Sequence, residues 1–224
     1  GYSILVAGGT GSGKTTFLNA LSEFIPEEER VVVIEDTAEL QIQHVPNLVR
    51  LETRSAGTED CKEISIRDLI RAALRMRPDR IIVGECRGAE ALDMLQAMNT
   101  GHDGSLSTGH ANSCEDMLHR LETMVLMGME LPLTAIRGQI ASGVDILVHV
   151  GRMRDGSRKL LNIMEVGAYT DGRIELSPLW EFQEKGEKGG KVIGEWKSRE
   201  KLKNTRKLEW AGIGKSSSQP ALRL

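Results

Sequence analysis

The order of apolar and polar positions divides the first 150 residues into short strands and amphipathic helices. Continuous apolar runs and alternating segments predict strands at 4–7, 31–34, 48–52, 80–85 and 144–150. Apolar positions three and four residues apart predict helices over 14–24, 65–74, 89–98, 113–127 and 132–141. The β-branched run at 31–34 is typical of a strand buried on both faces, which indicates an α/β fold with a mostly parallel sheet.

The last third of the chain has a different pattern. Asp155-Gly156 and Asp171-Gly172 separate apolar segments, which predicts antiparallel hairpins. From residue 184 the composition shifts to Lys, Glu and Gly. We therefore expect a core, a β-rich C-terminal extension, a charged appendage and a disordered tail, at 1–150, 151–183, 184–213 and 214–224.

Composition limits the class of protein. Of 224 residues, 40% are hydrophobic and 27% charged, as in ordinary soluble domains, and the net charge of −3 argues against a nucleic-acid footprint over the whole chain. No apolar run approaches a membrane span, and no signal-peptide pattern opens the sequence. The widely spaced Cys61, Cys86 and Cys114 indicate reduced thiols of a cytosolic protein and no metal site.

The strongest chemical signal follows the first strand. Its residues, which match the phosphate-binding pattern G-x-x-x-x-G-K-[ST] and run on into the next helix, are Gly8, Gly9, Thr10, Gly11, Ser12, Gly13, Lys14, Thr15 and Thr16. Glycines let the backbone direct several N–H groups at one anion, and the following helix adds the positive end of its dipole. Lys14 is expected to reach the β- and γ-phosphates, and the Thr15 hydroxyl to hold Mg²⁺. This loop predicts a nucleoside triphosphate site.

Carboxylates follow two of the predicted strands. Glu35, Asp36 and Glu39 come directly after 31–34, and Glu85 ends the strand at 80–85 in a Walker B pattern. Ligand groups of open α/β sheets collect at the carboxyl ends of strands, so these acids are expected near the bound phosphates. They could orient the attacking water and hold Mg²⁺, Glu85 directly or through water. For the first group, an acid-rich helix N-terminus is the alternative.

Two histidines flank a further short strand that the sequence predicts, with small polar residues around them. His102 and His110 could sense the γ-phosphate by a bond that forms with triphosphate and is lost with diphosphate. Two ordinary surface histidines are an equally good interpretation.

Basic residues gather between Lys197 and Lys207. Such a run could touch nucleic acid or anionic lipid, but a solvated helix face is the favoured interpretation.

Four segments in this order resemble the secretion ATPase superfamily, the motors of type II and type IV secretion and of type IV pilus assembly. They lie at 8–15, 34–40, 80–88 and 100–113 and resemble the Walker A motif, the Asp box, the Walker B motif and the His box. The chain looks closest to the CpaF/TadA branch, related to VirB11. The resemblance covers about residues 1–182 and implies a RecA-like P-loop NTPase core.

The resemblance also implies roles for single residues. Glu35 and Glu39 correspond to the Asp-box acids, with Glu39 the partner of the attacking water, and Glu85 to the Walker B acid. His102 and His110 correspond to the His-box pair. Arg75 and Arg87 match arginines that flank the Walker B motif, and Arg75 or Arg77 could reach a neighbouring subunit's nucleotide.

The implied function is ATP hydrolysis that powers pilus assembly or secretion across a bacterial envelope. The implied cofactors are ATP and Mg²⁺, and the implied assembly is a hexamer. Such a hexamer would act in the cytoplasm, at an inner-membrane platform protein and without direct nucleic-acid contact. The family's N-terminal domain is absent, so we expect this chain to be the C-terminal part of a longer protein. A RecA-like nucleic-acid translocase and a nucleotide-gated subunit without turnover are the alternatives.

Overall fold

The structure is a computed structural model that describes residues 1–56 and 62–213. Cys61 and the tail expected to be disordered at 214–224 lie outside the described residues. None of the helices within the described part has the length and apolar character needed to cross a membrane.

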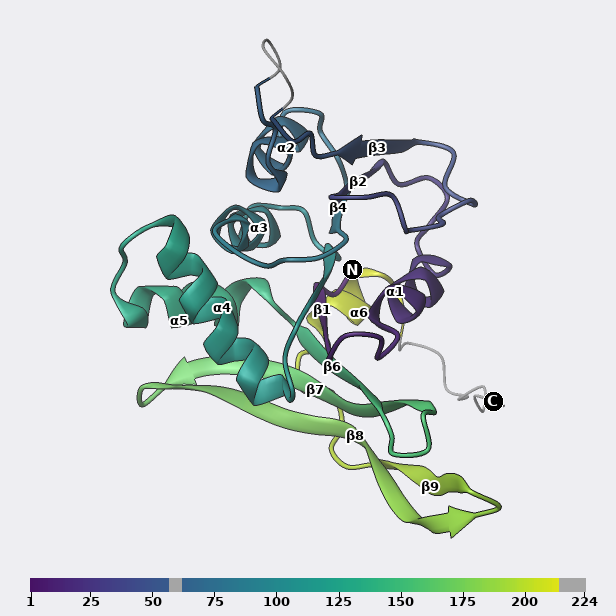
Figure 1. Cartoon of the computed structure of the whole chain (residues 1–224). Helices are drawn as coiled ribbons and strands as arrows, with labels where there is room; N and C mark the ends of the chain where they lie inside the picture. Colours follow the sequence, from purple (N-terminus) through teal and green to yellow (C-terminus); the bar gives the residue numbers. More distant parts are fainter. Residues whose placement is uncertain (57–61, 214–224) are drawn as a thin grey trace.

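A single nine-stranded sheet organises the molecule (Figure 1), with its strands in the order β3-β2-β4-β5-β1-β6-β7-β8-β9. The strands are β1 Ile4–Ala7, β2 Val31–Glu35, β3 Leu48–Glu52, β4 Arg80–Val83, β5 Leu106–Gly109, β6 Ile146–Arg152, β7 Arg158–Thr170, β8 Arg173–Lys188 and β9 Lys191–Ser198. All pairings from β3 to β6 are parallel, and those from β6 to β9 are antiparallel. The predicted α/β fold with a mostly parallel core is therefore confirmed.

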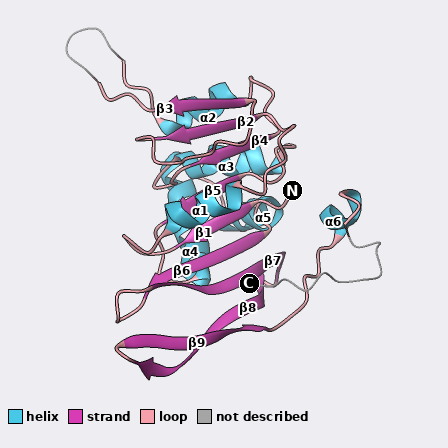
Figure 2. Ribbon diagram, turned by 90° about the vertical axis from the view of Figure 1, so that its right-hand side faces the viewer, coloured by secondary structure: helices cyan, strands magenta, loops and turns pink. Residues whose placement is uncertain are grey.

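Helices cover both faces of the parallel part of the sheet. The covering helices are α1 Lys14–Ser22, α2 Ile66–Ala73, α3 Glu90–Asn99, α4 Cys114–Gly128 and α5 Leu133–Gly143, and a short helix, α6 Arg206–Trp210, follows β9. Helices α2 to α5 pack into one core on one face, while α1 packs into separate cores on the other, as Figures 1 and 2 show. Two-sided cover explains why β2 and β4 are buried along their whole length.

Serine side chains cap two of the helices at their amino ends. Ser65 and Asp68 form a reciprocal capping box at the start of α2. The Ser113 hydroxyl accepts a hydrogen bond from the Asp116 N–H at 2.9 Å and caps α4. Local side chains thus set both boundaries.

The C-terminal strands continue the main sheet beyond the expected limit of residue 183. β8 runs on to Lys188, and the turn to β9 uses Gly189 and Gly190, both with positive φ. The expectation of a solvated helix face at 197–207 is wrong. Only the last residues of this run are helical, and Lys207 reaches back to Asp145 and Asp103 at 2.7 and 2.8 Å.

Candidate functional site

One pocket lies where the parallel strands end. It has a volume of about 330 Å³ and is lined by the phosphate loop and by the residues that follow β2, β4 and β5. Of the predicted residues, those lining it are Thr10, Gly11, Lys14, Thr15, Glu35, Asp36, Glu39, Glu85, Arg87 and His110. Strand order explains this convergence, because β1, β5, β4 and β2 are neighbours and point their carboxyl ends the same way.

The loop before α1 is shaped to hold an anion. Gly11 and Gly13 have φ of 69° and 98°, in the left-handed region that glycine adopts without strain. Lys14 Nζ donates to the carbonyls of Gly8 and Gly9 at 3.0 and 3.1 Å, and the buried Ser12 Oγ has no hydrogen-bond partner among the described residues. Burial lowers the pKa of Lys14, although the charge of Glu85 opposes this shift. Phosphate oxygens would offer Lys14 a charged partner and Ser12 a hydrogen-bond partner.

The two Asp-box acids have different surroundings. Glu35 is 5% exposed, and its Oε1 accepts the backbone N–H groups of Glu39 and Leu40, each at 3.0 Å. This carboxylate therefore shapes the chain that follows β2. Glu39 faces the loop instead, since Thr15 Oγ1 donates to its Oε2 at 3.3 Å.

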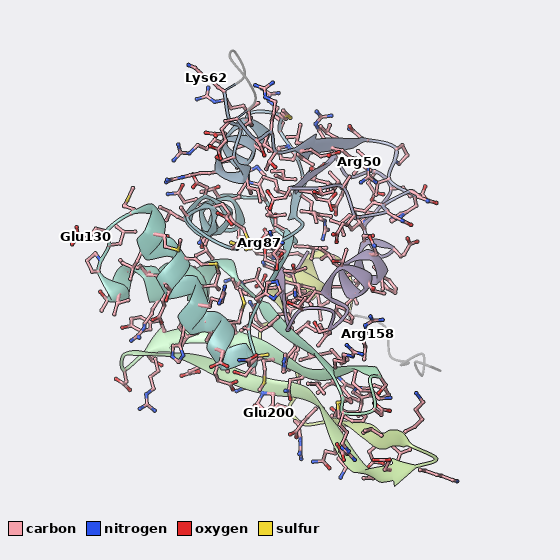
Figure 3. The ribbon with its side chains drawn as sticks, viewed as in Figure 1. Arg50, Lys62, Arg87, Glu130, Arg158 and Glu200 are labelled. Atoms are coloured by element: carbon pink, nitrogen blue, oxygen red, sulfur yellow. The ribbon has the colours of Figure 1, made fainter. Side chains whose placement is uncertain are left out.

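Glu85 forms the centre of a charged cluster. Its Oε2 accepts from Arg87 Nε at 2.6 Å, and Arg87 also pairs with Asp36 at 3.6 Å. Figure 3 labels Arg87 at the middle of the molecule. His110 Nε2 lies 2.7 Å from Glu85 Oε1, without the alignment of a hydrogen bond, and His110 Nδ1 lies 3.5 Å from Lys14 Nζ.

The protonation of His110 follows from these neighbours. Burial lowers the pKa of His110, Glu85 raises it, and the cations Lys14, Arg87 and Arg120 lower it further. The imidazole is therefore neutral at pH 7, with one nitrogen free to accept and one to donate.

The residues present fit a magnesium ion that arrives with a nucleotide. Glu85 Oε1 is a buried carboxylate oxygen without a hydrogen-bond partner in the described chain, and the Thr15 hydroxyl lines the same pocket. Within residues 1–56 and 62–213, no cluster of three or more His, Cys, Asp or Glu forms a cage for a metal. Mg²⁺ at nucleotide sites is usually held by one or two protein oxygens, phosphates and water, which suits this arrangement.

Two residues with predicted catalytic roles, His102 and Arg75, do not reach the pocket. His102 precedes β5 and places Nδ1 3.3 Å from the Ala97 carbonyl, whereas His110 follows the other end of the same strand. Arg75 follows α2 and lies near the start of β4, also at the amino edge of the sheet. One strand length separates the two edges, so neither side chain joins Lys14 and Glu85.

Thr108 and Arg158 are among the residues at the loop and the pocket that the sequence did not predict. Thr108 lines the pocket and donates from Oγ1 to the Gly84 carbonyl at 2.8 Å, which ties β5 to the end of β4. Arg158 Nε donates to the Gly11 carbonyl at 2.8 Å from β7. Thr108 lies inside the segment 100–113 that resembles the His box, but no sequence pattern around Arg158 indicates a role at the site.

The fold and the site together define a P-loop NTPase domain of RecA-like build. A phosphate loop follows the central strand β1, the acid Glu85 follows β4, and β5 lies between these two strands. Residues 1–171 match the family described as "Type II/IV secretion system protein", and the chain belongs to this family.

Curated relatives agree with this assignment. The chain is 46% identical over 178 residues to a putative conjugal transfer protein of Mycobacterium tuberculosis, covering 80% of this chain and 50% of that protein. It is 43% identical over 175 residues to the type IV secretion system protein PtlH of Bordetella pertussis, covering 77% and 51%. The chain thus spans about half the length of the curated relatives it matches.

Solved structures show the same fold. The VirB11 ATPase from the Brucella suis type IV secretion system, crystallised with sulphate, superposes with a TM-score of 0.66 at 38% identity, over 73% of this chain and 49% of that one. The pilus retraction motor PilT with bound ADP superposes with a TM-score of 0.57 at 28% identity, over 76% and 48%.

Proposed function

We propose that this chain is the ATP-hydrolysing domain of a motor that drives secretion or pilus assembly. The observation that carries the proposal is the meeting of Lys14, Glu39, Glu85 and His110 at one pocket beside the phosphate loop. The VirB11 neighbour is an ATPase crystallised with sulphate, and the PilT neighbour holds ADP, which supports a nucleotide site in this chain.

The residues divide the chemistry between them. Lys14 and the loop N–H groups bind the phosphates, and Lys14 exchanges its carbonyl partners for phosphate oxygens. Thr15 and Glu85 hold Mg²⁺, which offsets the charge of the β- and γ-phosphates when bound. Glu39 orients the attacking water, and Glu35 positions Glu39 through its backbone bonds. The neutral His110 donates to the γ-phosphate or to the water.

We further propose that the motor is a hexamer of the CpaF/TadA type. It would act in the cytoplasm, at the inner face of a bacterial membrane and against a platform protein there, without direct nucleic-acid contact. The support is the resemblance of the four motifs and the secretion and conjugation relatives.

Steady-state ATP hydrolysis by the wild type and by Glu85→Gln tests the enzymatic part. We expect Mg²⁺-dependent turnover in the wild type and at least a hundredfold loss in the variant, because a neutral amide cannot replace the carboxylate at Mg²⁺. Light scattering on the same samples shows whether turnover rises with assembly. Equal turnover in both proteins would contradict the assigned role of Glu85.

A further inference from the structure

The β6–β7 hairpin touches the phosphate loop at two places. Arg158, the first residue of β7, donates from Nε to the Gly11 carbonyl at 2.8 Å. Its Cδ would lie 3.1 Å from a Cβ placed on Gly13. At the base of the loop, a Cβ on Gly8 would lie 2.4 Å from the Val150 carbonyl of β6. The hairpin therefore packs against both ends of the loop.

The bond from Arg158 acts on the orientation of one peptide group. In a trans peptide the C=O and the next N–H point in opposite directions, so holding the Gly11 carbonyl outside turns the Ser12 N–H inward. That N–H makes only a long bond of 3.3 Å, to the Gly9 carbonyl. An inward N–H with a weak partner is suited to a phosphate oxygen.

The charge of Arg158 is also available to the loop. No carboxylate of the described residues lies within ion-pair distance of its guanidinium, whereas Arg154 in the same hairpin pairs with Glu184 at 2.6 Å and Glu187 at 3.4 Å. Figure 3 shows Arg158 on the side of the sheet that carries α1. A cation there favours an anion in the loop.

The same hairpin is joined to β8 and β9. Besides the Arg154 pairs, Asp155 Oδ2 accepts the Val192 N–H at 2.9 Å. Trp196 Nε1 donates to the Leu160 carbonyl at 2.8 Å, two residues beyond Arg158. β8 and β9 lie beyond residue 171, where the family match ends. A continuous set of contacts thus runs from the phosphate loop through β7 to β9.

We propose that Arg158 is a positioning residue that holds the phosphate loop in its anion-binding shape and couples nucleotide occupancy to the β8–β9 hairpin. The inference rests on the nucleotide binding that the proposed function assigns to the loop. It adds Arg158 of β7 to the residues that shape the phosphate loop. It also states that nucleotide binding at the loop is transmitted through β7 to β8 and β9.

Calorimetry with ADP and Mg²⁺, together with Trp196 fluorescence, tests both parts. Trp180→Phe and Trp210→Phe in the full chain leave Trp196 as the reporter beside Leu160. We expect ADP to change Trp196 emission, and Arg158→Ala to weaken ADP binding about tenfold and to abolish that change at saturating ADP. Arg158→Lys, which keeps the charge and one donor, should recover part of both.

Arg154→Ala is the matched control, because it removes an arginine of the same hairpin that bonds to β8 and not to the loop. It should bind ADP within about twofold of the wild type. Equal weakening by the two alanine variants would overturn the inference, since loss of hairpin structure would explain both. The inference would also be overturned if Arg158→Ala bound ADP with the affinity of the wild type and showed the same change in Trp196 emission. Failure of the wild type to bind ADP would instead overturn the proposed function.

Discussion

His110 lies between opposing charges at the edge of the phosphate site. Burial and the cations Lys14 and Arg87 lower the pKa of His110, while the Glu85 carboxylate raises it. The pKa of His110 is therefore higher in the unfolded chain than in the folded chain, so the unfolded chain takes up the imidazole proton at a higher pH. As pH falls below about 6.5, the ordinary histidine value, this difference removes stability until the folded His110 is also protonated.

Removing the charge of Glu85 should move this titration. We expect the NMR titration midpoint of His110 to lie below 6.5 in the wild type and lower still in Glu85→Gln, because the variant deletes the group that raises the pKa.

His149 provides the control in the same spectra. Burial lowers the pKa of His149 too, but Glu115 and Asp116 are the carboxylates that oppose it. Its midpoint should not respond to Glu85→Gln. An unchanged or raised His110 midpoint would contradict the contact between His110 and Glu85.

For single residues, the sequence alone predicted which side chains lie at the pocket where they belong to one short motif or follow one strand. Lys14 and Thr15 belong to one motif and Glu85 follows β4 by two residues, so their placement depends only on the neighbouring sequence. His102 and His110 belong to one short segment as well, but their separation depends on the strand between them. Arg158 meets Gly11 across 147 positions, and only the pairing of β7 with β6 brings them together.

Among the elements, α2 and α3 are joined by one buried carboxylate. Asp93, whose side chain is 5% exposed, accepts from Arg67 Nε at 2.7 Å and from Arg71 Nε at 2.8 Å. Asp93 therefore fixes α2 against α3. The residues just before α2, Ile64 and Ser65, line a cavity together with Arg87.

Asp93→Ala should destabilise the fold by about 1–3 kcal/mol, because it leaves two guanidinium groups without their shared partner. Arg71 is 57% exposed, so Arg71→Ala should cost less than about 1 kcal/mol. Urea unfolding of both variants measures the difference. A larger loss in Arg71→Ala would contradict the central position of Asp93.

Periodicity predicted the parallel core well because each strand and helix there is short and has one pattern. The helices expected to begin at 65 and 113 begin one residue later, directly after the capping residues Ser65 and Ser113. The prediction of a solvated helix face at 197–207 was wrong for a physical reason. Two of its lysines have partners far away in sequence, since the Lys203 backbone N–H donates to Glu165 and Lys207 Nζ donates to Asp145.

The whole molecule is closed at its amino edge by the segment that follows β9. Glu165, 4% exposed, accepts the N–H groups of Lys203 and Asn204 at 2.8 and 2.7 Å. Asp145 accepts both Lys207 Nζ and the Ser3 N–H, each at 2.7 Å. The start of β1 and the end of the described chain are thus held by the same carboxylate.

Lys207→Ala should loosen this edge without touching the nucleotide pocket at the opposite one. We expect hydrogen exchange at Ser3, Lys203 and Asn204 to speed up about tenfold, because the segment opens more often when its ion pairs are lost. Lys201→Ala, a change at an exposed lysine of the same segment, is the control and should leave these rates unchanged. Equal rates in both variants would contradict a docking role for Lys207.

Because β9 is the outermost strand of the described sheet, one side of its backbone is free to form hydrogen bonds with a strand of another chain. Exposed strand edges of this kind seed aggregation when they are apolar and flat. Lys191, Glu195 and Lys197 place charges along β9. Two copies meeting edge to edge would have to bury these charges, so the terminal strand protects the protein's solubility as well as completing its sheet.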